Sequence, residues 1–254
     1  MLNHLKTLSL SGVLTVFCLL YFVLPAWAND IIIPVGERNI SVNGKPYTMD
    51  APSFLEQGRL YVSSRSLANM LQADVKWQDK MDYQSITFNQ NGHSVVFLIG
   101  NNNYLVKHRE FYTSLEEMDA PPLLIGEKSY IPVRFLLENL GYRVSNDNNS
   151  LLAKFTGEFT KEGFVIPLES SLQNIKAYQA DILLELVVEN NMDLDKQMAE
   201  VKDILASQGI NPLPVINEVS SYFSKGYVNT SYGLGDKVTV HGLGKGAILI
   251  RIWR

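Results

Sequence analysis

Cysteine is almost absent from this chain of 254 residues: the only one, Cys18, lies inside an apolar N-terminal run. A chain that loses this run has no disulfide framework and no thiol chemistry. Basic runs are also missing, because 22 Lys and Arg stand against 26 Asp and Glu, for a formal net charge of −4. This balance disfavours binding to nucleic acid or to an anionic membrane surface. The sequence lacks low-complexity tracts, and its apolar content predicts globular folding throughout.

The first 28 residues have the features of a secretory signal peptide. Lys6 supplies a positive charge, residues 8–24 are almost wholly apolar, and Ala26-Trp27-Ala28 is a small-x-small cleavage site. We expect cleavage after Ala28 and a secreted, extracellular protein, either free or associated with the cell wall. An uncleaved membrane anchor is the alternative, because the apolar run is just long enough to span a bilayer. Lipid anchoring through Cys18 is disfavoured, because Phe17 occupies the place of the required small residue.

Two segments of the chain repeat each other in one register. Met49-Asp50-Ala51-Pro52 recurs 69 residues later as Met118-Asp119-Ala120-Pro121, and the register holds through Trp77 and Asn146. The 29 paired positions (49–77 against 118–146) contain 10 identities. Independent sequences of this composition would share roughly two, so an internal duplication is the economical explanation.

The second copy contains the stretch Tyr130-Ile131-Pro132-Val133-Arg134-Phe135-Leu136, which continues to Gly141 and Val144. This pattern resembles the N-terminal stalk domain of bacterial copper amine oxidases, a family that recurs in secreted proteins of Gram-positive bacteria. Val42-Asn43-Gly44-Lys45-Pro46 and Gly58-Arg59-Leu60-Tyr61-Val62 are similar to the first half of the same family, so the resemblance covers residues 31–156. It implies an accessory domain that lies apart from the copper centre.

Each copy is predicted to form a strand, a short helix and a second strand. Pro132 suits the first turn of a helix, and Gly141 suits the left-handed residue just beyond its end. Between the copies, Asn91-Gly92 separates two β-type runs and predicts a hairpin. The sequence departs from the family pattern at Ser63, where proline is usual, and at Gln72, where glycine is usual.

Residues 157–254 are predicted to form a second α+β domain, of no recognised family. Leu172, Ile182, Leu186 and Val187 fall on one helical stripe, although residues 182–188 also fit a buried strand. Further helices are predicted to open at Asp193-Leu194-Asp195 and to run over residues 215–223. Residues 237–241 and 247–253 are predicted to be strands that flank a turn. The fold class is therefore α+β, with residues 1–28 as signal peptide, 29–156 as the stalk-like domain and 157–254 as the second domain.

Candidate chemistry is sparse. The three histidines after the signal, His93, His108 and His241, lack the i, i+2 or i, i+4 spacing of a metal site, and we expect each at the surface. The carboxylates Asp181, Glu185 and Glu189 can hold a divalent cation, but a solvated helix face is the simpler explanation.

Two other patterns also have structural explanations. Gly242, Gly244 and Gly246 lie between two predicted strands, so a hairpin turn is expected there rather than a phosphate loop. Arg65 and Arg134, equivalent in the repeat, are expected to pin a helix to a neighbouring carboxylate or carbonyl, with an anionic ligand as the alternative. The Asn-Tyr-Asp/Glu motif of amine oxidases is missing, since Leu105 follows Tyr104.

The leading hypothesis is a non-catalytic binding or structural protein of the cell envelope, whose partner is a cell-wall component or another exported protein. We assign no catalytic residue, no cofactor and no metal ligand, and expect no nucleic acid or membrane partner after cleavage. Two alternatives remain open: an exported hydrolase with its site in residues 157–254, and a regulator or inhibitor of an exported enzyme.

Overall fold

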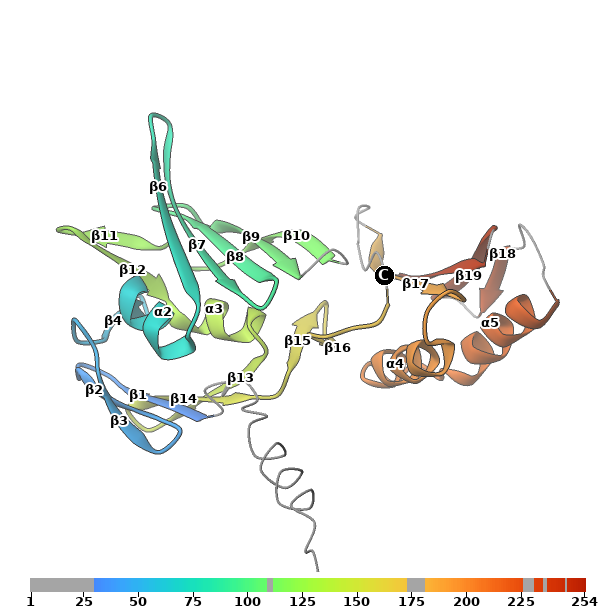
Figure 1. Ribbon diagram of the computed structural model, residues 1–254, viewed down its shortest axis with the longest axis horizontal. Coiled ribbons are helices and arrows are strands. Elements are labelled where there is room, and N and C mark those ends of the chain that lie inside the picture. The colour runs from blue at the N-terminus through green and yellow to red at the C-terminus, as the bar shows by residue number, and fades with distance from the viewer. Residues whose placement is uncertain (1–29, 109–111, 173–180, 226–230, 235–236, 245) are drawn as a thin grey trace, which may run out of the picture.

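The computed structural model describes residues 30–108, 112–172, 181–225, 231–234, 237–244 and 246–254 (Figure 1). The predicted signal peptide lies outside this part of the chain. The architecture mixes helices and strands, in agreement with an α+β class, and strands predominate. Within the described ranges, no helix has both the length and the apolar character needed to cross a membrane.

A four-stranded antiparallel sheet lies at the centre of the N-terminal part. Its strand order is β11-β12-β5-β4, and Val62 and Ile131 lie opposite each other across the β5–β12 pair. These two residues are 69 positions apart, as are the residues of the sequence repeat. The strands are β4 (Phe54–Glu56), β5 (Arg59–Ser63), β11 (Leu123–Ile125) and β12 (Lys128–Pro132).

Two five-stranded antiparallel sheets flank the centre, in the orders β10-β9-β8-β7-β6 and β13-β14-β1-β2-β3. The first contains β6 (Asp74–Lys80), β7 (Tyr83–Gln90), β8 (His93–Leu98), β9 (Asn103–His108) and β10 (Tyr112–Glu117). The second contains β13 (Tyr142–Asp147), β14 (Ser150–Phe155), β1 (Asp30–Pro34), β2 (Asn39–Val42) and β3 (Lys45–Thr48). Because β1 pairs with β14, the first described strand completes the sheet that follows the second repeat copy. The Asn91-Gly92 hairpin prediction is confirmed, with φ angles of 49° and 86°.

Two short helices connect these sheets, α2 (Ser64–Leu71) and α3 (Val133–Asn139), so that β5-α2-β6 and β12-α3-β13 each run strand, helix, strand. Ser63 caps α2, because its side chain accepts a hydrogen bond from the Ser66 N–H. Gln72 ends α2 in the left-handed region at φ 53°, the conformation for which glycine is usual. Pro132 directly precedes α3, and Gly141 lies beyond its end at φ 84°.

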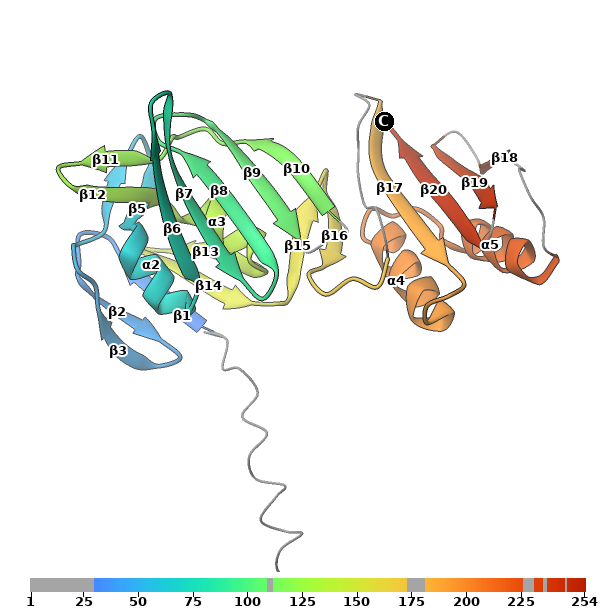
Figure 2. The same ribbon diagram turned by 45° about the horizontal axis from the view of Figure 1, so that its top comes forward.

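A small hairpin, β15 (Glu158–Lys161) and β16 (Phe164–Pro167), follows the N-terminal sheets. Its first strand lies against β10 and α3: Lys161 Nζ is 2.7 Å from Glu116 Oε1, and the Phe159 ring centroid is 4.2 Å from that of His108. Its second strand packs on α4 (Leu194–Ala206). The hairpin therefore contacts both the N-terminal sheets and the C-terminal helices (Figures 1 and 2).

The C-terminal part is a four-stranded antiparallel sheet of order β17-β20-β19-β18, with helices α4 and α5 packed on it (Figure 2). The remaining elements are β17 (Ile182–Glu189), α5 (Leu213–Lys225), β18 (Ser231–Leu234), β19 (Val238–Gly244) and β20 (Ala247–Trp253). The predicted helices that begin near residues 194 and 215 are confirmed, and so is the final hairpin.

The helix predicted along Leu172 to Val187 is wrong over residues 182–189, and the alternative of a buried strand is correct. Pairing with β20 imposes a period of two, which buries Ile182, Leu184, Leu186 and Val188 against the helices. The intervening residues 173–180 lie outside the described part of the chain.

Candidate functional site

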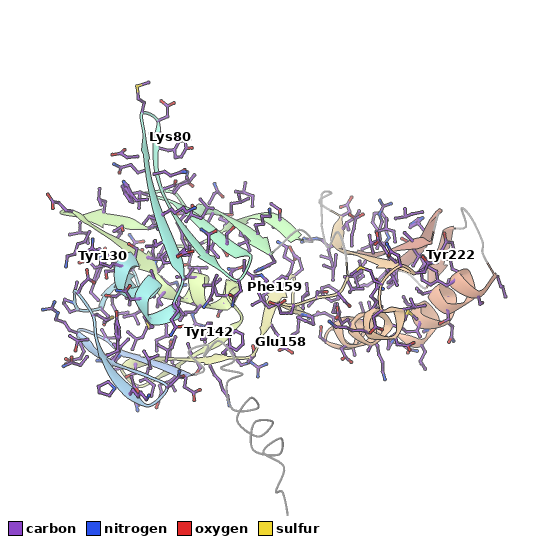
Figure 3. All side chains as sticks on the ribbon, viewed as in Figure 1. Lys80, Tyr130, Tyr142, Glu158, Phe159 and Tyr222 are labelled. Carbon is purple, nitrogen blue, oxygen red and sulfur yellow. The ribbon has the colours of Figure 1, made fainter. Side chains whose placement is uncertain are left out.

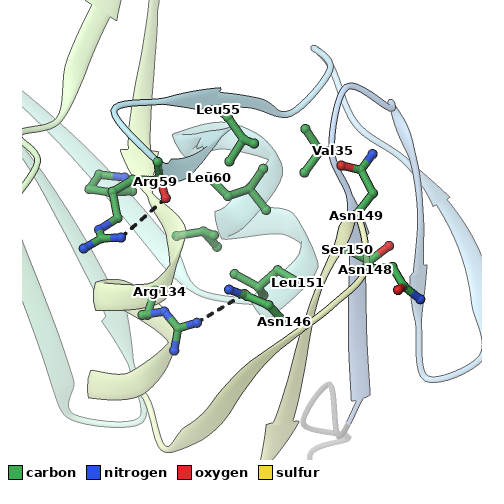
Figure 4. Close-up of a pocket in the computed structure, with 13 residues that line it drawn as sticks. Val35, Leu55, Arg59, Leu60, Arg134, Asn146, Asn148, Asn149, Ser150 and Leu151 are labelled. Carbon is green, nitrogen blue, oxygen red and sulfur yellow. Dashed lines mark hydrogen bonds between the residues drawn. The ribbon is translucent and has the colours of Figure 1, made fainter.

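A cleft with a volume of about 240 Å³ opens where three segments of the N-terminal part meet (Figure 4). The segments are the β4–β5 hairpin, the start of α3 and the β13–β14 turn. Apolar side chains of Val35, Leu60 and Leu151 line part of it, and polar groups line the rest. The polar lining residues are Arg59, Arg134, Asn146, Asn148, Asn149 and Ser150.

Arg134 enters the cleft from the first turn of α3. Its Nη1 donates to Glu138 Oε1 at 3.1 Å and to the Val144 carbonyl at 3.0 Å, and its Nη2 donates to Asn146 Oδ1 at 3.2 Å. Burial raises the pKa of Glu138, although the hydrogen bond and charge of Arg134 oppose this rise. The guanidinium thus ties α3 to β13, as the structural interpretation of the repeat predicts.

Arg59 enters the cleft from the start of β5. Its Nε donates to Asp119 Oδ1 at 2.8 Å, and its Nη2 pairs with the other oxygen of the same carboxylate. The hydrogen bond to Arg59 lowers the pKa of Asp119, and the same bond raises the pKa of the guanidinium. Both arginines of the cleft therefore already have a carboxylate partner.

The β13–β14 turn supplies the amide groups. Asn148 takes a left-handed conformation at φ 51°, which asparagine tolerates better than most residues, and its Nδ2 donates to Asp147 Oδ1. The Asn149 carbonyl accepts from the Val35 N–H at 2.9 Å, which anchors the turn to β1. Asparagine side chains offer both donors and acceptors, so this wall of the cleft suits a ligand rich in hydroxyl and amide groups.

A family model, copper amine oxidase N-terminal domain, matches residues 24–83 and 41–153. The two matches together span residues 24–153, just over half of the chain. The chain belongs to this family. All residues that line the cleft fall inside the matched span. No curated protein and no solved structure gives a significant match.

The copper amine oxidase N-terminal domain does not bring the two repeat-equivalent arginines together. Arg134 lines the cleft, whereas Arg65 is exposed on α2 and is not among the lining residues. The expectation of a carbonyl or carboxylate partner is therefore correct for Arg134. For Arg65, the structure gives no hydrogen bond to another described residue.

The prediction that His93 and His108 are surface residues is wrong. They are 1% and 0% exposed, and their Nδ1 atoms lie 3.2 Å apart across the β8–β9 pair. Both rings belong to the inward-facing residues of their strands, and Phe159 of β15 lies against the His108 ring. Burial, followed by the charge of His93, lowers the pKa of His108 to about 3. The third histidine, His241, is half-buried, with its Nε2 3.0 Å from Thr239 Oγ1.

The carboxylates Asp181, Glu185 and Glu189 do not converge. They lie at and along strand β17 rather than on a helix face, so residues four apart are separated by about 13 Å. Glu185 pairs with Arg251, with 2.7 Å between Oε1 and Nε. No group of three or more metal-ligating side chains occurs within the described ranges. The expected solvated helix face is thus corrected to a strand face with an ion pair.

Gly242 and Gly244 lie at the end of β19, where the β19–β20 register shifts, and Gly246 directly precedes β20, in agreement with the predicted hairpin. Gly242 lies against the Tyr222 ring, where a Cβ would come within 2.4 Å of a ring carbon. Close approach of this ring therefore accounts for a glycine at that position.

A second cavity, of about 450 Å³, lies between α3, β13 and β15. Two of its carboxylates already form ion pairs, Glu116 with Lys161 and Glu138 with Arg134. The Tyr142 hydroxyl is buried there and forms no hydrogen bond with any described residue. Arg143 and Glu158 also line this cavity, and neither forms an ion pair with a described residue, so this cavity too offers polar groups to a ligand.

Sequence reasoning missed Arg59 and the three asparagines of the cleft. Asn146 stands where the first copy has Trp77, and its side chain accepts a hydrogen bond from Arg134. The β13–β14 turn could have been predicted, because the pair Asn148-Asn149 between two β-type runs favours left-handed conformations. The approach of Arg59 to this turn depends on tertiary packing, which no local pattern encodes.

Proposed function

We propose that this protein is an exported, non-catalytic module of a Gram-positive-type cell envelope, and that its cleft binds the saccharide part of a wall polymer. The observation that supports this most is the chemistry of the cleft. It combines amide donors and acceptors with guanidinium groups whose charges are already balanced by Asp119 and Glu138. A neutral, hydroxyl-rich ligand fits such a surface without needing a net opposite charge.

The size of the cleft is consistent with one or two sugar rings rather than an extended chain. Its apolar wall, formed by Val35, Leu60 and Leu151, can cover the carbon face of a ring while the asparagines bond to hydroxyl groups. The signal sequence and the membership of residues 24–153 in a stalk-like domain family support a location outside the cytoplasm.

The two strand-helix-strand segments are proposed to be copies of one ancestral unit. Besides the Val62–Ile131 pair, the equivalent carboxylates Asp50 and Asp119 bind the equivalent cations Lys128 and Arg59. Each carboxylate thus forms an ion pair with a residue of the other repeat copy in the same chain. In this view the cleft combines both copies, because Arg59 comes from the first copy and Asn146, which stands where the first copy has Trp77, comes from the second.

The test is sedimentation of residues 29–254 with isolated Gram-positive cell walls. Asn149→Ala and Arg59→Gln remove one donor group each from the cleft, and loss of one hydrogen bond of about 1 kcal/mol lowers affinity about fivefold. Asn69→Ala and Arg65→Gln are matched controls, because both residues are exposed on α2 outside the cleft.

We expect a smaller fraction of each cleft variant to sediment with the walls, and we expect the controls to sediment as the parent chain does. Equal sedimentation of all four variants would contradict the proposal that the cleft binds the wall polymer. Failure of the parent chain to sediment would remove the wall saccharide as the ligand.

A further inference from the structure

The β6–β7 hairpin projects from the N-terminal part, with Lys80 near its tip (Figures 1 and 3). β6 is the last strand of its sheet, and all seven of its residues are exposed. Val75 and Trp77 keep 40% and 44% of their surface accessible, large values for apolar residues in a sheet. A long, exposed strand edge is a template for pairing with a further strand.

Backbone hydrogen bonds show which groups of β6 face this edge. The Ile99 N–H donates to the Gln84 carbonyl at 2.9 Å, so even-numbered residues of β7 bond towards β8 and odd-numbered ones towards β6. Tyr83 lies opposite Lys80, and therefore the even-numbered residues of β6 bond to β7. The N–H and C=O groups of Val75, Trp77 and Asp79 consequently point away from the sheet.

The equivalent edge in the second repeat copy is partly occupied by a side chain. There, the outward Val144 carbonyl accepts a hydrogen bond from Arg134. The equivalent residues of the first copy are Val75 and Arg65, and no hydrogen bond from Arg65 to a described residue is present. The first copy therefore lacks the side-chain hydrogen bond that occupies part of this strand edge in the second copy.

The sequence of β6 is complementary to itself about Trp77. If two copies pair antiparallel with Trp77 opposite Trp77, each Val75 lies opposite Asp79 of the other copy, and all outward groups are bonded. The same register places Asp74 opposite Lys80 of the other copy, twice. A shift by two residues in either direction instead places two lysines opposite each other, which is unfavourable.

We propose that the protein forms a two-fold symmetric dimer in which the β6 strands of two copies pair edge to edge, in register at Trp77. The two five-stranded sheets become one continuous sheet, and the two tryptophans lie side by side on one face. Such an interface is isologous and closes on itself, so it gives a dimer rather than a fibre. The proposal is independent of the ligand of the cleft.

The first test is a charge swap followed by analytical ultracentrifugation of residues 29–254. Asp74→Lys and Lys80→Asp each turn two attractive contacts into repulsive ones, and each should raise the dimer dissociation constant by about tenfold. The double variant restores both pairs and should return the constant towards the parent value. Lys45→Asp, on the exposed strand β3, is the control and should change nothing. Circular dichroism verifies that every variant is folded.

Cysteine cross-linking tests the register itself, because the chain has no cysteine beyond the signal segment. In the proposed register, Trp77→Cys places two thiols on residues whose Cα atoms are about 5.5 Å apart, within the range of a disulfide. Gln78→Cys does not, so it should cross-link far more slowly. A chain that is monomeric at every concentration would overturn the proposal. The proposal would also be overturned if the double charge variant dimerised as weakly as the single variants, or if the two cysteine variants cross-linked equally fast.

Discussion

At the residue scale, the buried histidine pair is the feature with the clearest physical consequence. Two neutral imidazoles can share one hydrogen bond, with one Nδ1 as donor and the other as acceptor. A proton added to Nδ1 of the acceptor ring removes the acceptor, and a proton added to either ring places charge in a buried site. Among the described residues, Phe159 lies against the His108 ring, and Glu169 Oε1 is 3.4 Å from His93 Nε2.

We predict that stability falls as the pH decreases through the range from about 6.5 to about 3. The pKa of His108 falls from its usual 6.5 to about 3 on folding, so the unfolded chain binds more protons in this window. The free energy of unfolding should decrease by at most about 1.4 kcal/mol per pH unit from this residue. Urea unfolding at a series of pH values measures the slope.

The variant His108→Leu serves as the comparison, because it removes the titrating ring and keeps the site apolar. Its unfolding free energy should depend less steeply on pH over the same window. Identical slopes for parent and variant would contradict the assignment of the effect to this pair.

At the scale of elements, Asp50 connects α2 to the central sheet. Its Oδ1 accepts hydrogen bonds from the Ser66 and Ser63 hydroxyl groups, and Lys128 Nζ lies 3.4 Å from Oδ2. Burial raises the pKa of Asp50, but the two serine hydrogen bonds and the charge of Lys128 lower it overall. Ser63 is the N-cap of α2, so the carboxylate orients the cap as well as the helix.

We predict that Asp50→Ala lowers the free energy of unfolding by about 1–3 kcal/mol, because it leaves partly buried hydroxyl groups without their acceptor. Asp119→Ala is the matched control at the equivalent repeat position. Its side chain is 53% exposed and forms a surface ion pair, so its loss should cost less than about 1 kcal/mol. Urea denaturation of both variants measures the difference, and equal costs would contradict this account of the anchor.

Some elements could be predicted from local sequence patterns, and others could not. Helix positions in the repeat were predictable, because Pro132 and Gly141 act locally on backbone conformation. Ser63 and Gln72 depart from the family pattern. Ser63 nevertheless begins α2 with a side-chain cap, and Gln72 ends it in the left-handed conformation. Strand β17 was ambiguous, since a short apolar run fits either a buried strand or a helix until its partner β20 is known.

At the scale of the whole molecule, the missed features all depend on pairing between distant segments. The cleft unites Arg59 with the turn around Asn149, which lies 90 residues further along the chain. The histidine pair depends on the β8–β9 register, which no spacing rule for metal sites detects. The β15–β16 hairpin contacts both parts of the protein, so a domain boundary placed before residue 157 stays a prediction.

The measurement that tests the central claim most directly is a nuclear magnetic resonance titration of residues 29–254 with soluble glycan fragments released from isolated walls. Our account predicts that the amide shifts that change cluster at the β4–β5 hairpin, the start of α3 and the turn at Asn148. The same titration of Asn149→Ala should need several times more ligand. Shift changes confined to residues outside the cleft, or none at saturating fragment, would contradict the claim that this cleft binds wall saccharide.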